Sequence, residues 1–176
     1  MNMIKVDIDA ENNMISVWNN GKGIPIQIHK EQGIYVPEMI FGHLLTSSNY
    51  NDEEQKVTGG RNGFGAKLAN IFSSKFILET ANTKNNKHYI QTFRDNMQRK
   101  DEPIISSNRE GLDYTKVSFC PDLTKFNMTH LDVDTVDLLT KRVYDLAGVT
   151  NAKVKVKLNG KLIDCKNFVQ YADYYL

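Results

Sequence analysis

The sequence has few cysteines, almost no net charge and no long apolar run, and each of these shortages argues against a class of site or partner. Its 2 cysteines, Cys120 and Cys165, stand outside any C-x-x-C or Cys/His spacing, which fits a reducing compartment and gives no zinc site. A net charge of +1 provides no global field for binding nucleic acid or a membrane. No signal peptide, transmembrane run, low-complexity tract or repeat is recognisable. The 4 histidines are scattered and form no ligand pair.

What is present is the composition of an ordinary soluble globular protein. The chain has 176 residues, of which 40% are hydrophobic and 24% charged, and this fits one domain with a core. Alternating and helical apolar patterns together predict an α+β two-layer sandwich, a mostly antiparallel sheet with helices on one face. Strands are expected at 4–9, 14–18, 75–80, 87–93, 113–119, 153–158 and 161–163, and helices at 37–45, from 65 onward, at 134–147 and near 168–175.

Residues 58–67 form the most distinctive stretch, with 4 glycines, 2 cations and an amide. The stretch runs into Leu68, Ile71 and Phe72, whose i, i+3, i+4 spacing predicts a helix that begins near Gly65. Glycine lets a ligand approach backbone N–H groups closely. A helix N-terminus supplies free N–H donors and a positive dipole end, and the lysine in its first turn adds a mobile charge suited to phosphate. These features indicate a polyphosphate site and favour a nucleotide.

Two familiar phosphate-binding motifs fail on spacing. A P-loop needs G-x-x-x-x-G-K-[ST], but Ala66 intervenes before Lys67, and Leu68 replaces the hydroxyl. A dinucleotide fingerprint needs a third glycine where Leu68 stands, and it needs a buried strand where residues 51–56 are polar. The glycine spacing that remains over residues 60–65 is a weak signal alone, and a solvent-exposed flexible loop is the alternative.

Two further loops carry groups of the kind that bind nucleotides. Residues 19–25 place a glycine pair after a strand, and the carbonyl of Asn19 can accept from the exocyclic amino group of a base; a plain turn is the alternative. Residues 46–50 carry hydroxyls and an amide for ribose or phosphate, or they form a capped loop. The polar segment 50–60 is interpreted as a lid over the nucleotide, or as a solvated connector. A Ser-His hydrolase using His43 has neither a G-x-S-x-G elbow nor a partner carboxylate to support it.

Taken together, the three loops resemble the ATPase domain of eukaryotic-type type II DNA topoisomerases. The resemblance is carried by residues 18–25, 44–50 and 58–73 in that order, and it runs over essentially the whole chain, including residues 119–123. That domain belongs to a superfamily shared with gyrase, histidine kinases and ATP-dependent chaperones. The resemblance therefore implies a Bergerat-type ATP-binding fold and a single ATP-binding domain over residues 1–176.

The resemblance also assigns residues to the parts of ATP. Asn19 takes the position of the Asp that usually reads the adenine amino group, and its carbonyl preserves the acceptor. Residues 47–49 match the run that contacts sugar and phosphate, and residues 60–67 match the loop around the triphosphate. Phe64 departs from the usual Tyr, so any contact from that hydroxyl is lost. Thr115 is expected to face inward near the base. The full candidate set comprises Asn19, Gly23, Ile24, Phe41, Thr46, Ser47, Ser48, Asn49, Gly60, Arg61, Asn62, Gly63, Phe64, Gly65, Ala66, Lys67 and Thr115.

Partners and a mechanism follow from the same resemblance. In that family ATP binding closes a homodimer gate around DNA in the nucleus, and hydrolysis, with Mg²⁺, resets it. The water-activating Glu and a magnesium-binding Asn lie on a helix upstream of the first strand, a Lys reaches the γ-phosphate from a following domain, and a Tyr far downstream cuts DNA. None of these elements is found in the 176 residues, so the chain is expected to be an N-terminally truncated fragment without catalytic or metal-binding residues of its own.

Two alternatives remain open at this stage. One is a chaperone-like or kinase-like ATPase of the same superfamily. The topoisomerase-like residues of all three loops argue against it. The other is a module that holds ATP without turnover. A general base contributes ~10²–10⁴-fold to a rate, so a chain without one is expected to show no measurable turnover. Without the upstream helix and its magnesium ligand, the chain is expected to bind ATP weakly at best. The glutamates that do not replace the missing base are Glu11, Glu31, Glu38, Glu53 and Glu54.

Overall fold

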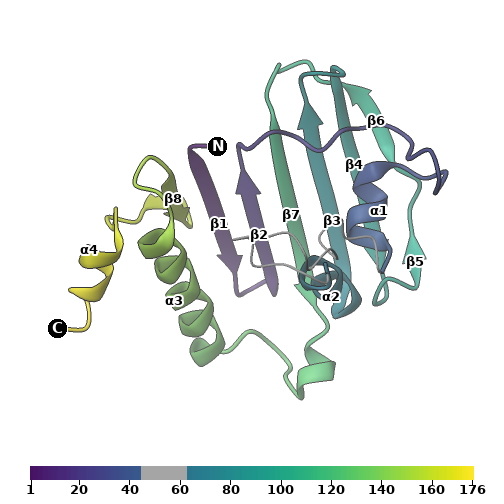
Figure 1. Ribbon diagram of the computed structural model, residues 1–176. Helices are drawn as coiled ribbons and strands as arrows, with labels where there is room; N and C mark the ends of the chain where they lie inside the picture. The colour runs from purple at the N-terminus through teal and green to yellow at the C-terminus, as the bar shows by residue number, and fades with distance from the viewer. Residues whose placement is uncertain (45–62) are drawn as a thin grey trace, which may run out of the picture.

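One mixed sheet, mostly antiparallel, forms the frame of the molecule (Figure 1). The computed structural model describes residues 1–44 and 63–176. Within these ranges the strand order is β5-β4-β3-β7-β2-β1-β8-β9, with β6 paired to β4. The pair β1–β8 is parallel, and the other pairs are antiparallel. The strands are β1 (Met3–Asp9), β2 (Met14–Asn19), β3 (Ser73–Asn82), β4 (Lys87–Arg94), β5 (Arg99–Lys100), β6 (Ile104–Ser107), β7 (Tyr114–Pro121), β8 (Lys155–Leu158) and β9 (Lys161–Leu162).

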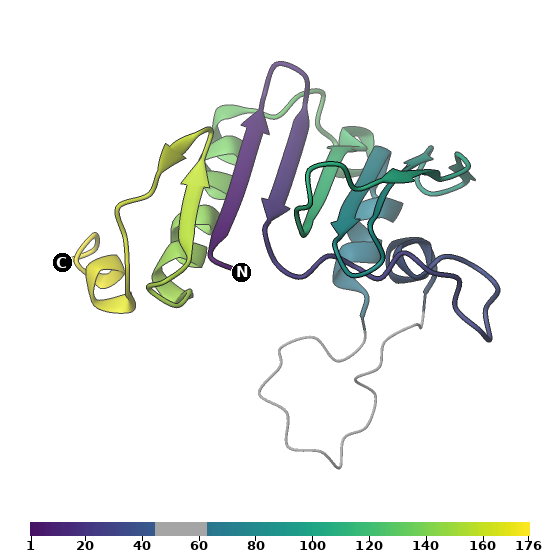
Figure 2. The ribbon, with the colours of Figure 1, turned by 90° about the horizontal axis from the view of Figure 1, so that it is seen from above.

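Helices lie at both ends of this sheet. Figure 2 shows α4 and the C-terminus at the end that α3 occupies, with α1 at the opposite end. None of the helices in the described part of the chain is long and apolar enough to cross a membrane. The helices are α1 (Val36–Gly42), α2 (Gly65–Ile71), α3 (Val133–Val149), α4 (Phe168–Ala172) and a short 3₁₀ turn, η1 (Leu123–Phe126).

The register of the strands shows which side chains share a face of the sheet. Val6 pairs with Val17, which also pairs with Val117. Val117 pairs in turn with Leu78, so all four side chains lie on one face, because directly opposed residues point the same way. The helices α1, α2 and α3 pack on this face, as the α+β prediction required.

Two separate hydrophobic cores form under these helices. The first joins α3 to β1 and β8, and its buried members are Ile4, Val6, Ile8, Val143, Ala147, Val156, Ile163 and Cys165. The second lies where α1 and α2 meet β3, β4 and β7, and its buried members are Ile26, Phe76, Leu78, Tyr89 and Phe93. The strip of sheet between the two cores belongs to β2 and to the neighbouring part of β7.

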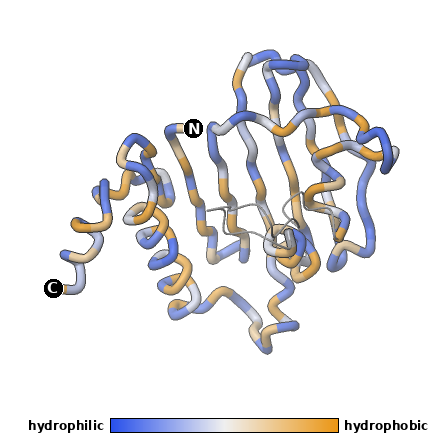
Figure 3. The backbone as a smooth tube through the Cα atoms, in the orientation of Figure 1, coloured by the Kyte–Doolittle hydropathy of each residue, from blue (hydrophilic) through white to orange (hydrophobic). Residues whose placement is uncertain are grey.

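Local sequence explains why these elements form where they do. Hydrophobic and hydrophilic residues alternate along β1, as the colouring of Figure 3 shows, because one face is buried and the other is not. The Asp132 carboxylate caps α3 by accepting from the Thr135 N–H at 2.8 Å. Asn159 and Gly160 have φ of 46° and 78°, the positive values that the turn between β8 and β9 requires.

The expected strands and helices are confirmed, with three differences. The short strands β5 and β6 were not predicted, because runs of two and four residues carry little periodicity. Leu68 in α2 and Phe72 directly after it are 46% and 41% exposed, while Lys67 and Asn70 of the helix are buried. The helix α3 continues beyond the predicted end at residue 147 to Val149, and a Cβ at Gly148 would meet the ring of Tyr171 at 2.6 Å.

Candidate functional site

A row of polar side chains crosses three neighbouring strands between the two cores. Asn19 at the end of β2 pairs with Thr115 in β7, and Thr115 pairs with Thr80 in β3. All three therefore lie on the face that carries the helices. Two residues along the same strands and on the same face stand Val17, Val117 and Leu78. This face of the sheet therefore changes from hydrophobic to polar at the row.

The Thr80 hydroxyl is the centre of this row. It is fully buried and donates to the Tyr114 carbonyl at 2.8 Å. The backbone N–H of Ile24 donates to it at 3.1 Å, and the Thr115 hydroxyl lies 3.1 Å away. One side chain thus joins β3, β7 and the loop that follows β2.

The Asn19 amide is oriented by its backbone neighbours. Its Oδ1 accepts from the Gly21 N–H at 3.0 Å, and its Nδ2 points to the Thr115 carbonyl at 3.5 Å. A carbonyl oxygen has two lone pairs, so Oδ1 keeps one acceptor position after binding Gly21. Asn19 therefore presents a further hydrogen-bond acceptor at the end of the row.

The glycine loop after β2 is held against β3 by close backbone contacts. A Cβ built on Gly23 would lie 1.7 Å from the Ala81 carbonyl oxygen, so only glycine fits there. The Asn82 side chain donates to the Gly23 carbonyl at 2.7 Å, and both atoms are buried. At the start of the loop, the Asn20 side chain accepts from the Met3 N–H at 2.8 Å. These contacts fix the loop beside the polar row.

Phe41 and the end of α1 contact α2 directly. The Asn70 side chain in α2 donates to the Phe41 carbonyl at 3.0 Å. The Phe41 ring packs on Phe76 with a centroid distance of 6.0 Å, so it belongs to the second core. This contact brings together the two helices that flank residues 45–62 in sequence.

Lys67 lies in the first turn of α2 and is 3% exposed. Its Nζ donates to the Gly63 carbonyl at 3.0 Å. Burial lowers the pKa of this ammonium, because desolvation disfavours the charged form. Phe64 is 37% exposed, Gly65 and Ala66 are exposed, and a Cβ on Gly65 would meet nothing within 4 Å. Backbone at Gly65 is therefore open to approach.

A buried carboxylate fastens α1 to the sheet. Glu38 is 5% exposed, and its carboxylate accepts from Lys100 at 2.6 Å and from Gln91 at 3.0 Å. The His43 ring lies 3.4 Å from the same carboxylate. Burial opposes ionisation of Glu38, but these hydrogen bonds outweigh it and hold the pKa of the carboxyl below its ordinary value.

Two adjoining cavities lie on the other face of the sheet. One is lined in part by His88 and Tyr114, and the other by Trp18 and Tyr114. Trp18 and Tyr114 are next to Asn19 and Thr115 in sequence, and successive strand residues point to opposite faces. Burial and the hydrogen bond to a glutamate raise the pKa of the Tyr114 hydroxyl. These cavities are therefore distinct from the polar row.

The structure brings some of the expected site residues together, and others lie outside the residues that it describes. Asn19 and Thr115 meet in the polar row, with Gly23 and Ile24 beside them, whereas Phe41 lies in the second core. Among the described residues, no group of three His, Cys, Asp or Glu side chains could hold a metal ion. Gly63, Phe64, Gly65, Ala66 and Lys67 lie at the start of α2. Thr46, Ser47, Ser48, Asn49, Gly60, Arg61 and Asn62 fall outside the described residues.

Sequence reasoning missed three residues that shape the site: Thr80, Asn82 and Asn70. Thr80 had a detectable signal, because it is the polar member of the alternating run Phe76, Leu78, Thr80 on the buried face of β3. Asn82 and Asn70 had none, since their partners are the carbonyls of Gly23 and Phe41, 59 and 29 residues away.

Comparison with known proteins gives consistent relatives. No protein-family model matches the chain. The chain is 58% identical over 176 residues to DNA topoisomerase 2 of Arabidopsis thaliana and 54% identical to that of Drosophila melanogaster. The match covers 100% of this chain but only 12% of the length of each of these relatives.

The similar solved structures are also of type II DNA topoisomerases. The ATPase region of Saccharomyces cerevisiae topoisomerase II superposes with a TM-score of 0.96 at 53% identity, covering 99% of this chain and 46% of that one. The ATPase and transducer domains of DNA topoisomerase II from Balamuthia mandrillaris superpose with a TM-score of 0.91 at 46% identity, covering 98% and 44%.

Proposed function

We propose, because the chain matches the ATPase region of DNA topoisomerase II over its whole length, that it binds ATP on the helical face of the sheet. The observation that carries this proposal is the row of Asn19, Thr115 and Thr80 between the two cores, with the glycine loop fixed beside it. Acceptor groups at the end of an apolar strip suit a base that is flat, apolar on its faces and polar at its edge.

Asn19 and Thr115 of the row take the base, and the start of α2 takes the phosphates. The free acceptor position of Asn19 Oδ1 suits the exocyclic amino group of adenine. Open backbone at Gly65 suits a phosphate oxygen, which needs close approach to N–H groups. Lys67 Nζ is bonded to the Gly63 carbonyl, and exchange of this partner for a phosphate would replace a neutral acceptor by a charged one.

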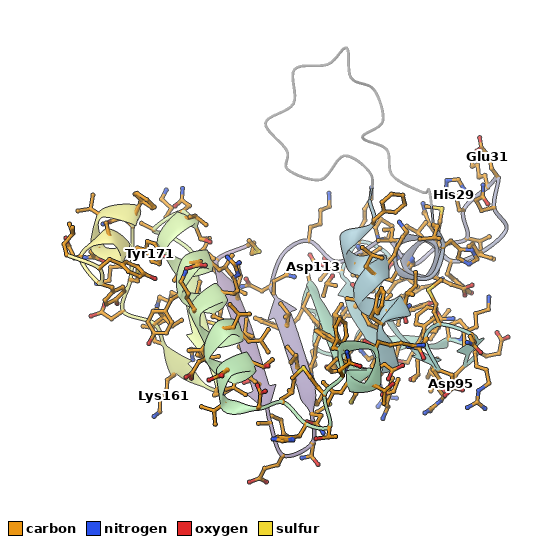
Figure 4. All side chains as sticks on the ribbon, turned by 90° about the horizontal axis from the view of Figure 1, so that it is seen from below. His29, Glu31, Asp95, Asp113, Lys161 and Tyr171 are labelled. Atoms are coloured by element: carbon orange, nitrogen blue, oxygen red, sulfur yellow. The ribbon has the colours of Figure 1, made fainter. Side chains whose placement is uncertain are left out.

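This assignment can be tested by amide chemical-shift mapping with a non-hydrolysable ATP analogue. Shifts are expected at Asn19, Gly23, Thr115 and Lys67, the residues proposed to surround the nucleotide. The hairpin of β8 and β9 serves as an internal control, because Lys161 points away from the rest of the fold (Figure 4). Perturbations confined to that hairpin would contradict the assignment.

The activity of a whole enzyme around this chain is also a proposal. The relatives are named DNA topoisomerases, and this supports an isomerase in which ATP binding closes a homodimer around DNA, with action in the nucleus. Magnesium would accompany the triphosphate and neutralise part of its charge. The described residues offer no cluster of metal ligands, so its shell would come from phosphates, water and groups elsewhere.

A second candidate is ATP binding without turnover by the 176-residue chain itself. The observation that favours it is the placement of the described glutamates. Glu38 is buried and hydrogen-bonded to Lys100 and Gln91, so it is not free to take a proton from water. Glu31 lies at the outer tip of the loop before α1 (Figure 4). We propose that the chain supplies the nucleotide pocket and leaves the general base to other parts of the enzyme.

A further inference from the structure

We propose that Thr80, which does not itself face the nucleotide, makes the site prefer adenine over guanine by fixing the direction of the Thr115 hydroxyl. The proposal rests on the proposed function, since it concerns the same base pocket. Its basis is the hydrogen-bond pattern around the two threonine hydroxyls, which lie 3.1 Å apart on neighbouring strands.

The direction of each hydroxyl follows from counting protons. A threonine hydroxyl has one proton to donate and two lone pairs with which to accept. The Tyr114 carbonyl can only accept, and at 2.8 Å it takes the Thr80 proton. The Ile24 N–H can only donate, so it occupies one Thr80 lone pair. Thr80 is fully buried, which leaves no water to supply another partner.

Thr115 must therefore donate its own proton to the remaining lone pair of Thr80. Once that proton is committed, the Thr115 oxygen retains only lone pairs for any ligand above it. Asn19 likewise presents an oxygen, because its Oδ1 is the atom turned toward the Gly21 N–H. The two groups at the edge of the pocket are thus both acceptors.

A pair of acceptors distinguishes the two purine bases. Adenine carries an amino donor at the position where guanine carries a carbonyl acceptor. The amino group of adenine can bond to Asn19 and, directly or through water, to Thr115. Guanine would place oxygen against oxygen and leave the protein acceptors unpaired. If Thr115 were free to rotate, its hydroxyl could donate to the guanine carbonyl and this rejection would weaken.

The test compares ATP and GTP affinities, measured by titration calorimetry on the full chain. We expect Thr80→Val to free the Thr115 proton and to reduce the ATP-over-GTP preference roughly two- to tenfold, the range for one hydrogen bond. Thr80→Ser keeps the hydroxyl and should keep the preference. Thr115→Val removes the acceptor itself and should lower the preference to a similar degree without touching Ile24 or Tyr114.

Three outcomes would overturn the proposal. Thr80→Val could weaken both nucleotides equally, which would reduce Thr80 to a structural support of the loop. Thr80→Ser could change the preference as much as Thr80→Val. In the third, Thr80→Val could still change the preference in a Thr115→Val background, where no hydroxyl remains to be directed. Thermal unfolding of each variant shows that it is folded.

The unmodified chain separates this proposal from the proposed function. If it binds neither ATP nor GTP, the proposed function fails and this inference falls with it. If it binds both with equal affinity, nucleotide binding stands and the role of Thr80 in base selection is refuted.

Discussion

At the scale of single residues, the site depends on a glycine that no other residue could replace and on a buried lysine. Gly23 has no Cβ because the Ala81 carbonyl occupies that space, 1.7 Å from where the Cβ would be. Lys67 keeps an ammonium in a buried position, which lysine rarely occupies without a partner, and here the partner is the Gly63 carbonyl.

We expect Gly23→Ala to destabilise the chain by at least ~1–3 kcal/mol, the range for overpacking a site that cannot relax. The neighbour is backbone in the middle of the sheet, so it cannot turn away. Chemical denaturation would measure the loss. The matched control is Gly65→Ala, where a Cβ meets nothing within 4 Å and the expected change is within about 0.5 kcal/mol. Equal effects of both changes would show that Gly23 is not held as described.

Lys67→Met should separate binding from stability. The buried ammonium has a lowered pKa, meaning that its charged form is disfavoured in the folded state, so a neutral side chain of similar length should not lower the melting temperature. Loss of a charge-assisted contact should nevertheless weaken ATP by ~1.5–3 kcal/mol and leave adenosine unchanged. Calorimetric titration with both ligands decides the point. A parallel loss for adenosine would place Lys67 away from the phosphates.

At the scale of elements, α1 is attached to the sheet by the carboxylate of Glu38. The hydrogen bonds from Lys100 in β5 and Gln91 in β4 reach Glu38 in the first turn of α1, so they hold the start of this helix against the sheet. A short helix of 7 residues has little stability of its own and depends on such anchors.

This attachment predicts a pH dependence. The pKa of Glu38 is lowered in the folded state, so its stabilising contribution is complete above the ordinary glutamate pKa of about 4.3 and is lost as pH falls through the folded value. Glu38→Gln removes this contribution and should lose less stability than the unmodified chain on acidification. Urea unfolding between pH 6 and 3 would measure both, with exposed Glu31→Gln as the control. Identical pH profiles for Glu38→Gln and the unmodified chain would contradict the account.

At the scale of the whole molecule, two cores flank a strip of sheet that neither core covers. Val17, in the middle of β2 on the helical face, is 37% exposed although its strand neighbour Ile15 is buried. A protein with one continuous core would cover Val17. We attribute the location of the proposed nucleotide site to this partly exposed strip between the two cores.

For the 176-residue chain we expect no measurable ATP turnover in a steady-state phosphate-release assay. A general base contributes ~10²–10⁴-fold to a rate. Glu38 is buried and hydrogen-bonded to Lys100, and Glu31 lies at the outer tip of the loop before α1 (Figure 4), so we propose that neither acts as that base. If the unmodified chain hydrolysed ATP and Lys67→Met did not, the expectation would be wrong. The chain would then carry a general base other than Glu38 and Glu31.

Most of the strands and helices, and the expectation of a nucleotide ligand, follow from the amino-acid sequence alone. Alternation along β1 and β3, the helical spacing of α3 and the glycine-rich loops depend on neighbours within a few residues, and such local patterns are visible in the chain. The motifs of the three loops were enough to indicate the topoisomerase resemblance that the relatives confirm.

Only the tertiary structure decided how the site is assembled. Thr80 meets Thr115 across 35 residues and Ile24 across 56, and Asn82 meets Gly23 across 59. The spacing of Leu68, Ile71 and Phe72 predicted the helix α2, but it did not show that Leu68 and Phe72 are exposed while Lys67 and Asn70 are buried. Asn70 has its partner, the Phe41 carbonyl, on α1. Such partners are set by strand register and helix docking, which depend on the whole fold and leave no mark in the local sequence.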